Sequence, residues 1–470
     1  MSQPSSSQPR AESGALRRKE VDLRLVPLGF GAVILLGTAL LLLPWTHRAG
    51  HSLGWRDALF LSTSATCVTG LSTVNVGETF NWLGEVVLFA LIQAGGLGIF
   101  TASLSLVILS GNRLSLTDEQ TIQATVGRLD RARPLDIFIY ACLFVVGLEL
   151  AGAVALFWLM SHASSHPDIY RTLWEAAFHS VSAFCNAGIS TYPENLARWR
   201  DYPGVLAVLS LLVITGGIGL MTLINLRYFY FWRRDPLRRG RLTLQTKLSV
   251  LSAVALLLFG TATSWAFELR HTLSHASLGE QLSWSFFHSA MSRTAGFNVV
   301  DPGQMSPPTL FTTIVLMFIG GAPGSTAGGI KTVTFAVLLL TAWSALRRRD
   351  GVQLGKHRLP AKTAPVATLL VLLALACVVT AVGVLMLLED GHPASQTHQQ
   401  WMAVVFETVS AFCTVGLSTG ITPLLTPGGQ CVIIALMFMG RIGPLMLSIY
   451  LARPANPLRV RQPEEELALG

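Results

Sequence analysis

The chain has 470 residues, of which 51% are hydrophobic and 13% are charged, and its mean hydropathy is +0.52. This composition excludes an ordinary soluble multidomain protein and indicates an all-α polytopic membrane protein. The formal net charge is +8. Its charges are too sparse and too segregated for a nucleic-acid-binding surface, so no nucleic acid is expected as a partner.

The first 110 residues contain a tail, a full span and a helix too short to span. Residues 1–24 are rich in Ser and Pro and then basic, which predicts a disordered cytoplasmic tail and not a cleaved signal peptide. The apolar run 25–43 is long enough to span. The helical stretch from Arg56 has about a dozen residues, which at ~1.5 Å per residue reaches roughly halfway across a hydrocarbon core of ~30 Å. It enters the membrane without crossing it, and the span 82–109 follows.

A glycine motif ends this half-helix and recurs three times. It reads SATCVTGLST at 64–73, and the other copies occupy 182–191, 290–299 and 410–419. The four glycines are spaced 118, 108 and 120 residues apart: Gly70, Gly188, Gly296 and Gly416. A phenylalanine falls ten residues before each of them: Phe60, Phe178, Phe286 and Phe406. We interpret the whole chain as a fourfold array.

We expect each unit of the array to consist of an outer helix, a pore half-helix, a filter loop and an inner helix, with the four units around one central pore in a K⁺-channel-like fold. The later helices are predicted at 136–160, 172–184 and 203–230, at 247–268, 281–292 and 308–346, and at 364–388, 399–412 and 430–452. The predicted organisation is a tail 1–24, pore repeats 25–110, 136–232, 247–346 and 364–452, cytoplasmic linkers 111–135, 233–246 and 347–363, and a cytoplasmic tail 453–470.

Positive charge predicts the orientation independently of the repeat. The segments after the first three inner helices and both tails are basic, with Arg113 and Arg128, then Arg227 and the run to Arg241, then Arg347 to Arg349. Cytoplasmic segments of membrane proteins carry such an excess of Lys and Arg. Both termini are therefore expected in the cytoplasm, and the half-helices are expected to enter from outside.

Four glycine loops at matching depth point to a cation pore. Irregular backbone at membrane depth is tolerated only inside protein or along an aqueous cavity, because unsatisfied carbonyls in lipid cost several kcal/mol each. Converging carbonyls can replace the hydration shell of an ion. Each half-helix also aims the negative end of its dipole, roughly half an elementary charge, at the centre, which favours a cation. The bland alternative is that the glycines only permit close helix packing.

Glycine suits such a loop because it adopts positive φ and leaves no side chain between the backbone and the ion. The neighbouring side chains differ between the copies, which indicates coordination of a cation by backbone oxygens near the four glycines. The candidate filter residues are Thr66, Cys67, Val68, Thr69 and Gly70; Cys185, Asn186, Ala187 and Gly188; Arg293, Thr294, Ala295 and Gly296; and Cys413, Thr414, Val415 and Gly416.

Two residue types in this register need their own account. Cys67, Cys185 and Cys413 each lie three residues before a glycine, in different repeats and without a histidine, so small buried filler is favoured over a metal site or a disulfide. Arg293 replaces the cysteine in repeat three. Its charge would repel a cation, so we expect it to point away from the axis and to pair behind the filter, with Glu268 and Glu280 as candidate partners.

A second glycine register appears about 25 residues after each filter glycine. Gly95-Gly96 and Gly216-Gly217 begin its first two copies, where close packing is the favoured explanation and a hinge the alternative. The third copy reads GGAPGSTAGG and cannot be continuous helix. The apolar segment around it is also too long for one span, so we predict an intramembrane gate loop at 320–330. Its candidate gate residues are Gly320, Gly321, Ala322, Pro323, Gly324, Ser325, Thr326, Ala327, Gly328 and Gly329.

The fourth copy carries Arg441, the only charged residue within its inner helix. A charge at this depth costs a few kcal/mol, so a functional role is the first hypothesis. We expect Arg441 to lie under the filter against the loop and to slow cation exit; a purely structural tether to loop carbonyls is the alternative. Lys331 is expected at the cytoplasmic mouth.

Other classes of protein fit less well. An enzyme is not expected, because no apolar span carries a carboxylate pair or a His/Asp cluster with ligand spacing. A secondary transporter with broken helices remains an alternative, although such folds usually show two related halves. A sensory or scaffolding membrane protein would leave four pore-like loops unexplained.

The motifs at 64–71, 183–190, 292–298 and 411–420 resemble those of the Trk/Ktr/HKT superfamily of potassium transporters, most closely the KtrB-type subunits, over about residues 25–452. The resemblance implies inward K⁺ transport gated by the intramembrane loop and arginine, with all four filter glycines favouring K⁺ over Na⁺. It also implies a homodimer of two complete pores in a bacterial inner membrane and a separate RCK-type regulator, KtrA-like, that binds ATP or ADP. No covalent cofactor is expected, and Na⁺ is a candidate activator.

Overall fold

The computed structural model describes residues 25–109, 134–163, 168–232, 242–349, 352–354, 357–360, 363–392 and 400–452. The predicted tails 1–24 and 453–470 lie outside these residues. So do most of the linkers 111–135 and 233–246 and part of 347–363. The described chain is almost entirely helical, with one two-stranded hairpin, β1 (Gln353–Leu354) and β2 (His357–Arg358).

Long outer helices, short helices and inner helices alternate along the chain. The outer helices are α1 (Leu25–Leu41), α6 (Pro134–Ala163), α10 (Leu244–Glu268) and α14 (Thr363–Leu388). The short helices that end at the glycine motifs are α2 (Trp55–Thr66), α7 (Ile169–Phe184), α11 (Leu278–Met291) and α15 (Gln400–Phe412). The inner segments are α4 (Trp82–Leu109), α8 (Pro203–Ile218) with α9 (Leu220–Trp232), α12 (Pro307–Phe318) with α13 (Thr332–Leu346), and α16 (Pro427–Ala452); a single turn, α3 (Val76–Thr79), precedes α4.

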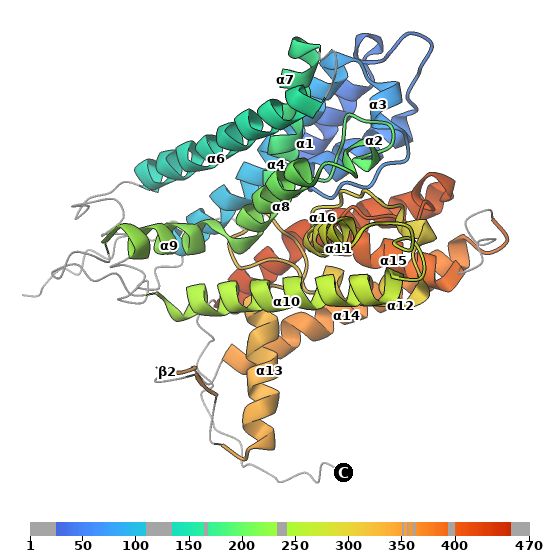
Figure 1. Ribbon diagram of the computed structural model, residues 1–470. Helices are drawn as coiled ribbons and strands as arrows, with labels where there is room; N and C mark the ends of the chain where they lie inside the picture. Colours follow the sequence, from blue (N-terminus) through green and yellow to red (C-terminus); the bar gives the residue numbers. More distant parts are fainter. Residues whose placement is uncertain are drawn as a thin grey trace, which may run out of the picture.

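Most of these helices run along a common direction, with the short helices inside the bundle (Figure 1). Three described helices are long and apolar enough to cross a membrane, and the bent pair α8–α9 makes a fourth if it is counted as one span. Shorter apolar helices, such as Val26–Leu41 and Trp82–Gly98, accompany them. The chain is therefore a helical, multi-pass membrane protein.

One serine in each of the first three short helices fixes that helix to its outer helix. The hydroxyl donates to a carbonyl of the outer helix in three equivalent pairs: Ser62 to Ile34 at 2.7 Å, Ser180 to Glu149 at 2.6 Å and Ser289 to Leu257 at 2.8 Å. Three residues beyond each carbonyl is a glycine whose missing Cβ makes room for the serine: Gly37, Gly152 and Gly260. In lipid, such small-residue contacts and interhelical hydrogen bonds replace the hydrophobic effect as the source of helix association.

The phenylalanine ten residues before the glycine is buried in three units and exposed in the third. Phe60, Phe178 and Phe406 are fully buried, whereas Phe286 is 37% exposed and Phe287 takes the buried position. The serine contact of the third unit, at Ser289, also lies one residue nearer its glycine than Ser62 or Ser180 does. The short helix of this unit is therefore shifted by one residue relative to its glycine.

The inner segment of the second unit is also not the continuous helix expected at 203–230. It breaks at Gly219, which has φ +90° and ψ 140°, and the two parts are bent by 99°. At this point the carbonyl of Gly217 accepts a hydrogen bond from the amide of Ala322, and the amide of Leu220 donates to the carbonyl of Gly324. Backbone groups that would otherwise form the hydrogen bonds of a continuous helix from α8 to α9 are thus bonded to a segment of the third unit.

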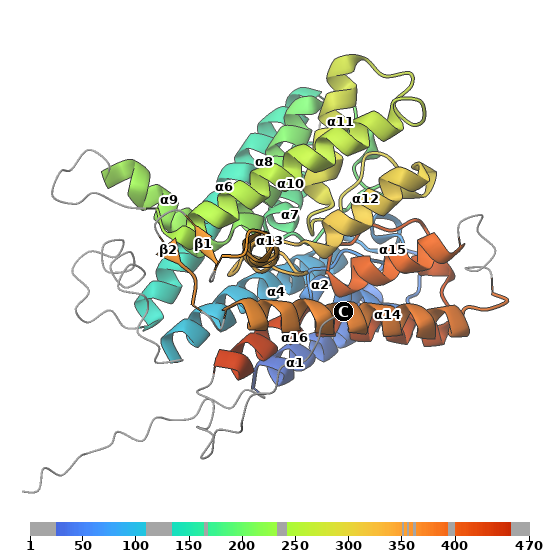
Figure 2. The same cartoon turned by 90° about the horizontal axis from the view of Figure 1, so that it is seen from below.

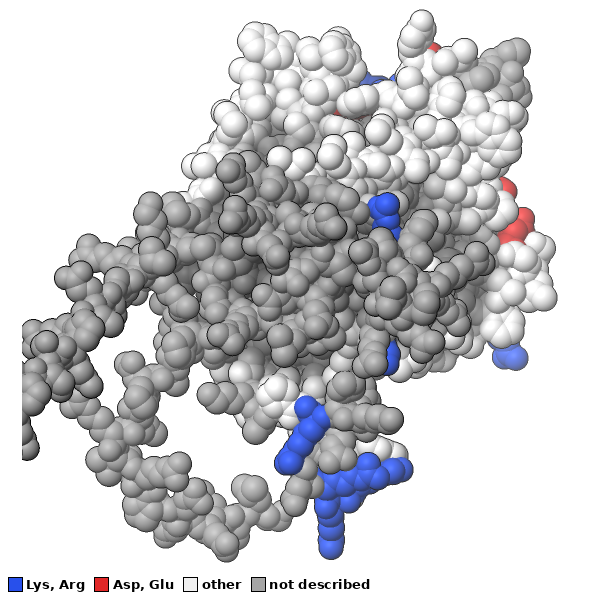
Figure 3. Space-filling model, turned by 90° about the vertical axis from the view of Figure 1, so that its left-hand side faces the viewer, with Lys and Arg blue, Asp and Glu red and all other residues white. Residues whose placement is uncertain are grey.

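That segment, residues 319–331, separates α12 from α13. The helix α13 leaves the bundle crosswise to α10 and α14 in Figure 1 and is seen end-on in Figure 2. Its exposed face carries Leu339, Trp343 and Leu346. The arginines that follow it, Arg347 to Arg349, are exposed, and Lys and Arg gather at the lower end of the view in Figure 3.

Candidate functional site

The four glycine motifs form one closed ring. A Cβ built on each filter glycine would overlap a carbonyl oxygen of the next motif: Gly70 meets Ala187, Gly188 meets Ala295, Gly296 meets Val415, and Gly416 meets Thr69. Each glycine also has positive φ, between +66° and +100°. A larger residue would be excluded by both the space and the backbone conformation. The order of contacts runs once around the chain and returns to its start.

Each loop contains a second left-handed residue besides its glycine. Two residues before each glycine, a non-glycine residue also has positive φ: Val68, Asn186, Thr294 and Thr414, at 56°, 61°, 77° and 50°. Left-handed residues are uncommon outside glycine and concentrate at functional sites. The left-handed conformation therefore recurs at two positions in every one of the four loops.

The expected filter side chains are buried, but they do not share one role. Among the described residues, the hydroxyls of Thr66, Thr69 and Thr414 have no hydrogen-bond partner. Asn186 instead joins two loops, because its amide lies 3.2 Å from the hydroxyl of Thr294. Cys67 and Cys413 are fully buried within the apolar core around the ring.

Arg293 points behind the ring, but its expected partners are wrong. Its guanidinium donates to the carbonyl of Ala253 on α10 at 3.0 Å. Ala253 lies 15 residues before Glu268 on the same helix, a distance of ~22 Å at ~1.5 Å per residue. Glu280 is also engaged elsewhere, since it accepts hydrogen bonds from Ser277 at 2.8 Å in a capping box.

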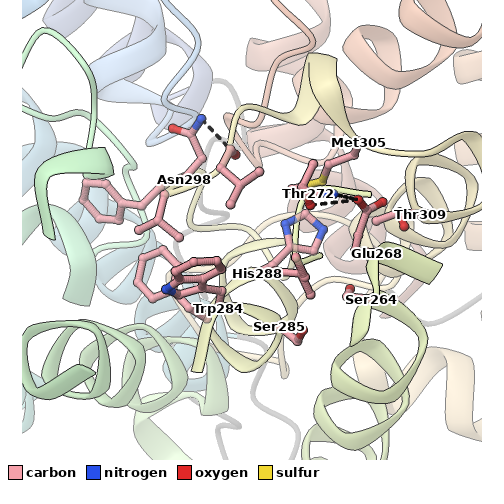
Figure 4. A pocket seen from close by; sticks show the side chains of 14 residues that line it. Ser264, Glu268, Thr272, Trp284, Ser285, His288, Asn298, Met305 and Thr309 are labelled. Carbon is pink, nitrogen blue, oxygen red and sulfur yellow. Dashed lines mark hydrogen bonds between the residues drawn. The ribbon is translucent and has the colours of Figure 1, made fainter. Parts of the chain in front are cut away.

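Glu268 belongs to a separate polar cluster at the outer end of α10 (Figure 4). Its carboxylate accepts from Ser306 at 2.7 Å and from Thr272 at 2.8 Å. His288 of α11 lies beside it and is 2.9 Å from Thr313 on α12. A cavity of about 20 Å³ separates these groups, enough for one water molecule. A similar contact occurs at the end of α14, where the carboxylate of Glu389 accepts a hydrogen bond from the hydroxyl of Thr426 at 2.7 Å. We interpret both carboxylates as caps of the inner helix that follows.

The inner-helix glycines lie directly under the ring. A Cβ on Gly95 would overlap the carbonyl of Thr66, one on Gly216 that of Phe184, and one on Gly440 that of Phe412. These carbonyls belong to the last residues of the short helices. Close packing therefore accounts for the glycines of units one, two and four, and a bend is added only at Gly219 in unit two.

The segment 319–331 crosses beneath the ring and contacts units two and four. Gly320 donates to Ile330 at 3.0 Å, which closes the segment at its base. Thr326 reaches unit two, where its hydroxyl donates to the carbonyl of Phe184 at 3.2 Å. Gly328 packs against the carbonyl of Cys413 in unit four. All the candidate gate residues from Gly320 to Gly329 lie in this segment.

Two cationic side chains hold the segment. Arg441 is 4% exposed and donates from Nη1 to the carbonyl of Thr326, while its Nε and Nη2 have no partner among the described residues. Lys331 donates to the carbonyl of Ala327 at 2.6 Å. Both line a cavity of about 560 Å³ beneath the segment, bounded by apolar residues of α14 and α16.

Two polar networks were missed as parts of the site. Arg171 forms a bidentate ion pair with the buried Glu85, at 2.8 and 2.9 Å, which ties α7 to α4. Glu149 of α6 is 5% exposed and contacts Gln93 and Cys185 next to the second loop. The sequence does show Glu149 as an isolated carboxyl in an apolar helix, which is the signal that could have drawn attention to it.

The structure thus defines a multi-pass membrane protein in which four half-length helices end at a single ring of backbone carbonyls. Residues 29–456 match the family described as TrkH, cation transport protein. The chain belongs to this family, whose members are transport proteins and not enzymes, and this membership confirms the resemblance to the Trk/Ktr superfamily.

Relatives match over nearly the whole length of the chain. The chain is 35% identical to the Ktr system potassium uptake protein B of Vibrio alginolyticus, over 97% of this chain and 96% of that protein. It is 34% identical to the Potassium/sodium uptake protein NtpJ of Enterococcus hirae, with 97% and 98% covered. The crystal structure of the potassium transporter TrkH from Vibrio parahaemolyticus has the same fold, with a TM-score of 0.70 at 18% identity over 94% of this chain and 86% of that one.

Proposed function

We propose that this chain is the ion-translocating membrane subunit of a potassium uptake system and passes K⁺ inward through the ring of four loops. The closed order of contacts from Gly70 through Gly188 and Gly296 to Gly416 carries the proposal. A ring of backbone carbonyls can replace the hydration shell of a cation. The short helices add the negative ends of their dipoles at the same place. The relatives named as potassium uptake proteins support K⁺ as the ion.

In this proposal the segment from Gly320 to Gly329 is the gate. It lies beneath the ring, and Arg441 and Lys331 hold two of its carbonyls. A positive charge directly below a cation filter opposes exit of the ion, so the closed path is stabilised electrostatically as well as sterically. Opening requires the segment to leave its contacts with Gly217 and Phe184.

The assembly in the cell follows from the same relationship. The subunit is expected to work as a homodimer of two pores in a bacterial inner membrane, with both termini in the cytoplasm. A separate RCK-type subunit that binds ATP or ADP would act on the gate from the cytoplasmic side, where Arg347 to Arg349 are exposed. The relative named for both potassium and sodium uptake supports Na⁺ as a candidate activator.

Uptake in a bacterial strain without its own potassium uptake systems tests the proposal. The wild-type chain, Gly70→Ser and Gly296→Ser are compared with and without a matched regulatory subunit, in potassium-limited growth and in uptake of Rb⁺ or K⁺. Rescue by the wild type is expected, and the glycine variants should lose K⁺ affinity or selectivity because the added atoms collide with the next loop. Rescue that ignores both glycines would favour a broken-helix transporter instead.

A further inference from the structure

The outer helices meet the short helices at equivalent positions that carry different side chains. The carbonyls that accept from Ser62, Ser180 and Ser289 belong to Ile34, Glu149 and Leu257. Two of these positions are therefore aliphatic, and one is a carboxyl buried at membrane depth. Because a carboxyl there costs free energy that Ile or Leu does not, its presence needs a compensating role.

The carboxyl of Glu149 links two helices to the second filter loop. Gln93 on α4 donates from Nε2 to Glu149 Oε2 at 2.9 Å. The thiol of Cys185 lies 3.6 Å from Glu149 Oε1 and 3.8 Å from Gln93 Oε1, so it donates to one or the other. Among the described residues, no Lys or Arg pairs with Glu149 and neither Cys67 nor Cys413 donates to a carboxyl.

Cys185 is held on its other side as well. A Cβ on Gly96 would lie 2.5 Å from its sulfur, so α4 packs directly against it. Cys185 is the first residue after α7 and stands three residues before Gly188, which touches the carbonyl of Ala295 in the next loop. A lateral shift of Cys185 would therefore move the carbonyls of the second loop and their contact with the third.

We propose that Glu149 is a positioning residue that sets the ion selectivity of the filter by holding the second loop through Cys185. This inference rests on the proposed function of the ring. The hydrogen bonds that Glu149 makes with Gln93 and Cys185 fix the depth and the lateral position of the second loop. At the equivalent positions of units one and three, Ile or Leu can position the loop only by packing. Selectivity is thus set partly by a side chain that never contacts the ion.

The test compares K⁺ with Na⁺ uptake in proteoliposomes of equal protein content. Glu149→Leu copies the residue of unit three and removes the hydrogen bonds, so the K⁺/Na⁺ uptake ratio should fall about tenfold, the effect of losing one or two modest hydrogen bonds at the filter. Glu149→Gln keeps a group that can bond both Gln93 and Cys185, and its ratio should stay near wild type. Val145→Ala, one turn earlier in α6 and equally buried, is the packing control and should leave the ratio unchanged.

A double-mutant cycle separates positioning from general packing. If Glu149 acts through Cys185, then Glu149→Leu combined with Cys185→Ala should lower the ratio no further than either change alone. Additive losses, a shifted ratio in Val145→Ala, or a wild-type ratio in Glu149→Leu would each overturn the inference. Gly188→Ser is measured in parallel. If Gly188→Ser shifts the ratio and Glu149→Leu does not, the result supports the ring as the filter and contradicts the role of Glu149. If neither changes the ratio, the ring itself is not the filter.

Discussion

In the proposed function, Arg441 serves both the fold and the gate. It occupies the position of the second glycine in the other inner helices, and one of its nitrogens holds the carbonyl of Thr326. Its Nε and Nη2 remain without partners in the described part of the chain. A residue needed only as a tether would be expected to satisfy all its donors, because unsatisfied buried groups cost about 1–3 kcal/mol each.

Replacement of this arginine should therefore open the path. Arg441→Ala is expected to raise the initial rate of K⁺ uptake, about tenfold for each ~1.4 kcal/mol of barrier that the charge supplies. The measurement is Rb⁺ uptake normalised to membrane abundance, with the half-exposed Arg198→Ala as a control for loss of a surface charge. Unchanged or lower uptake at equal abundance would leave Arg441 as a structural tether.

The break between α8 and α9 belongs to the scale of elements. Gly219 has a backbone conformation that side chains rarely adopt, and a Cβ there would meet the carbonyl of Pro323 at 2.7 Å. The break lets α8 end against the gate segment, so two elements of different units share backbone hydrogen bonds. Strain at such a position costs about 1–3 kcal/mol.

Gly219→Ala is expected to lower the thermal unfolding midpoint in detergent, consistent with a loss of about 1–3 kcal/mol. Gly217→Ala supplies the matched control, because its helical position has space for a Cβ, with Asn186 at 3.7 Å. Alanine in an unstrained helical site is neutral or stabilising by up to ~1 kcal/mol. Equal midpoints for the two variants would show that the break accepts a side chain at position 219 without strain.

The sequence predicts those elements that depend on interactions between residues close together in the chain. Apolar runs, their lengths and the glycine motif are local signals, so the outer helices, half-length helices and the interruption after Phe318 were predicted to within a few residues. The break at Gly219 depends on hydrogen bonds to residues a hundred positions away. The glycines at 216–219 mark the place and left a hinge open as the alternative to close packing, but the same pattern in unit one stays helical, so the pattern alone does not decide between the two. The predicted partners of Arg293 were wrong for the same reason. Its partner is the backbone carbonyl of Ala253, and every residue has such a carbonyl, so the sequence does not distinguish it.

At the scale of the whole molecule, the same serine contact recurs within three of the four units. Ser62, Ser180 and Ser289 each join a short helix to its outer helix and lie in different units. Because they are far apart in the fold and share no partner, their contributions should add.

Each change of these serines to alanine is expected to cost about 0.5–1.5 kcal/mol, and the triple variant about the sum. Thermal unfolding in detergent measures this, with Thr368→Ala as the control, because that exposed hydroxyl bonds only to Ala364 of its own helix. A triple variant no less stable than the singles would show that the contacts are not independent braces.

The ring closes within a single polypeptide, from Gly70 to Gly416 and back to Thr69. A cell that makes two alleles of this chain would therefore build two kinds of ring, each uniform, and never a ring of mixed walls. A substitution in one version of the chain therefore alters its own rings and leaves the rings of the other version unchanged.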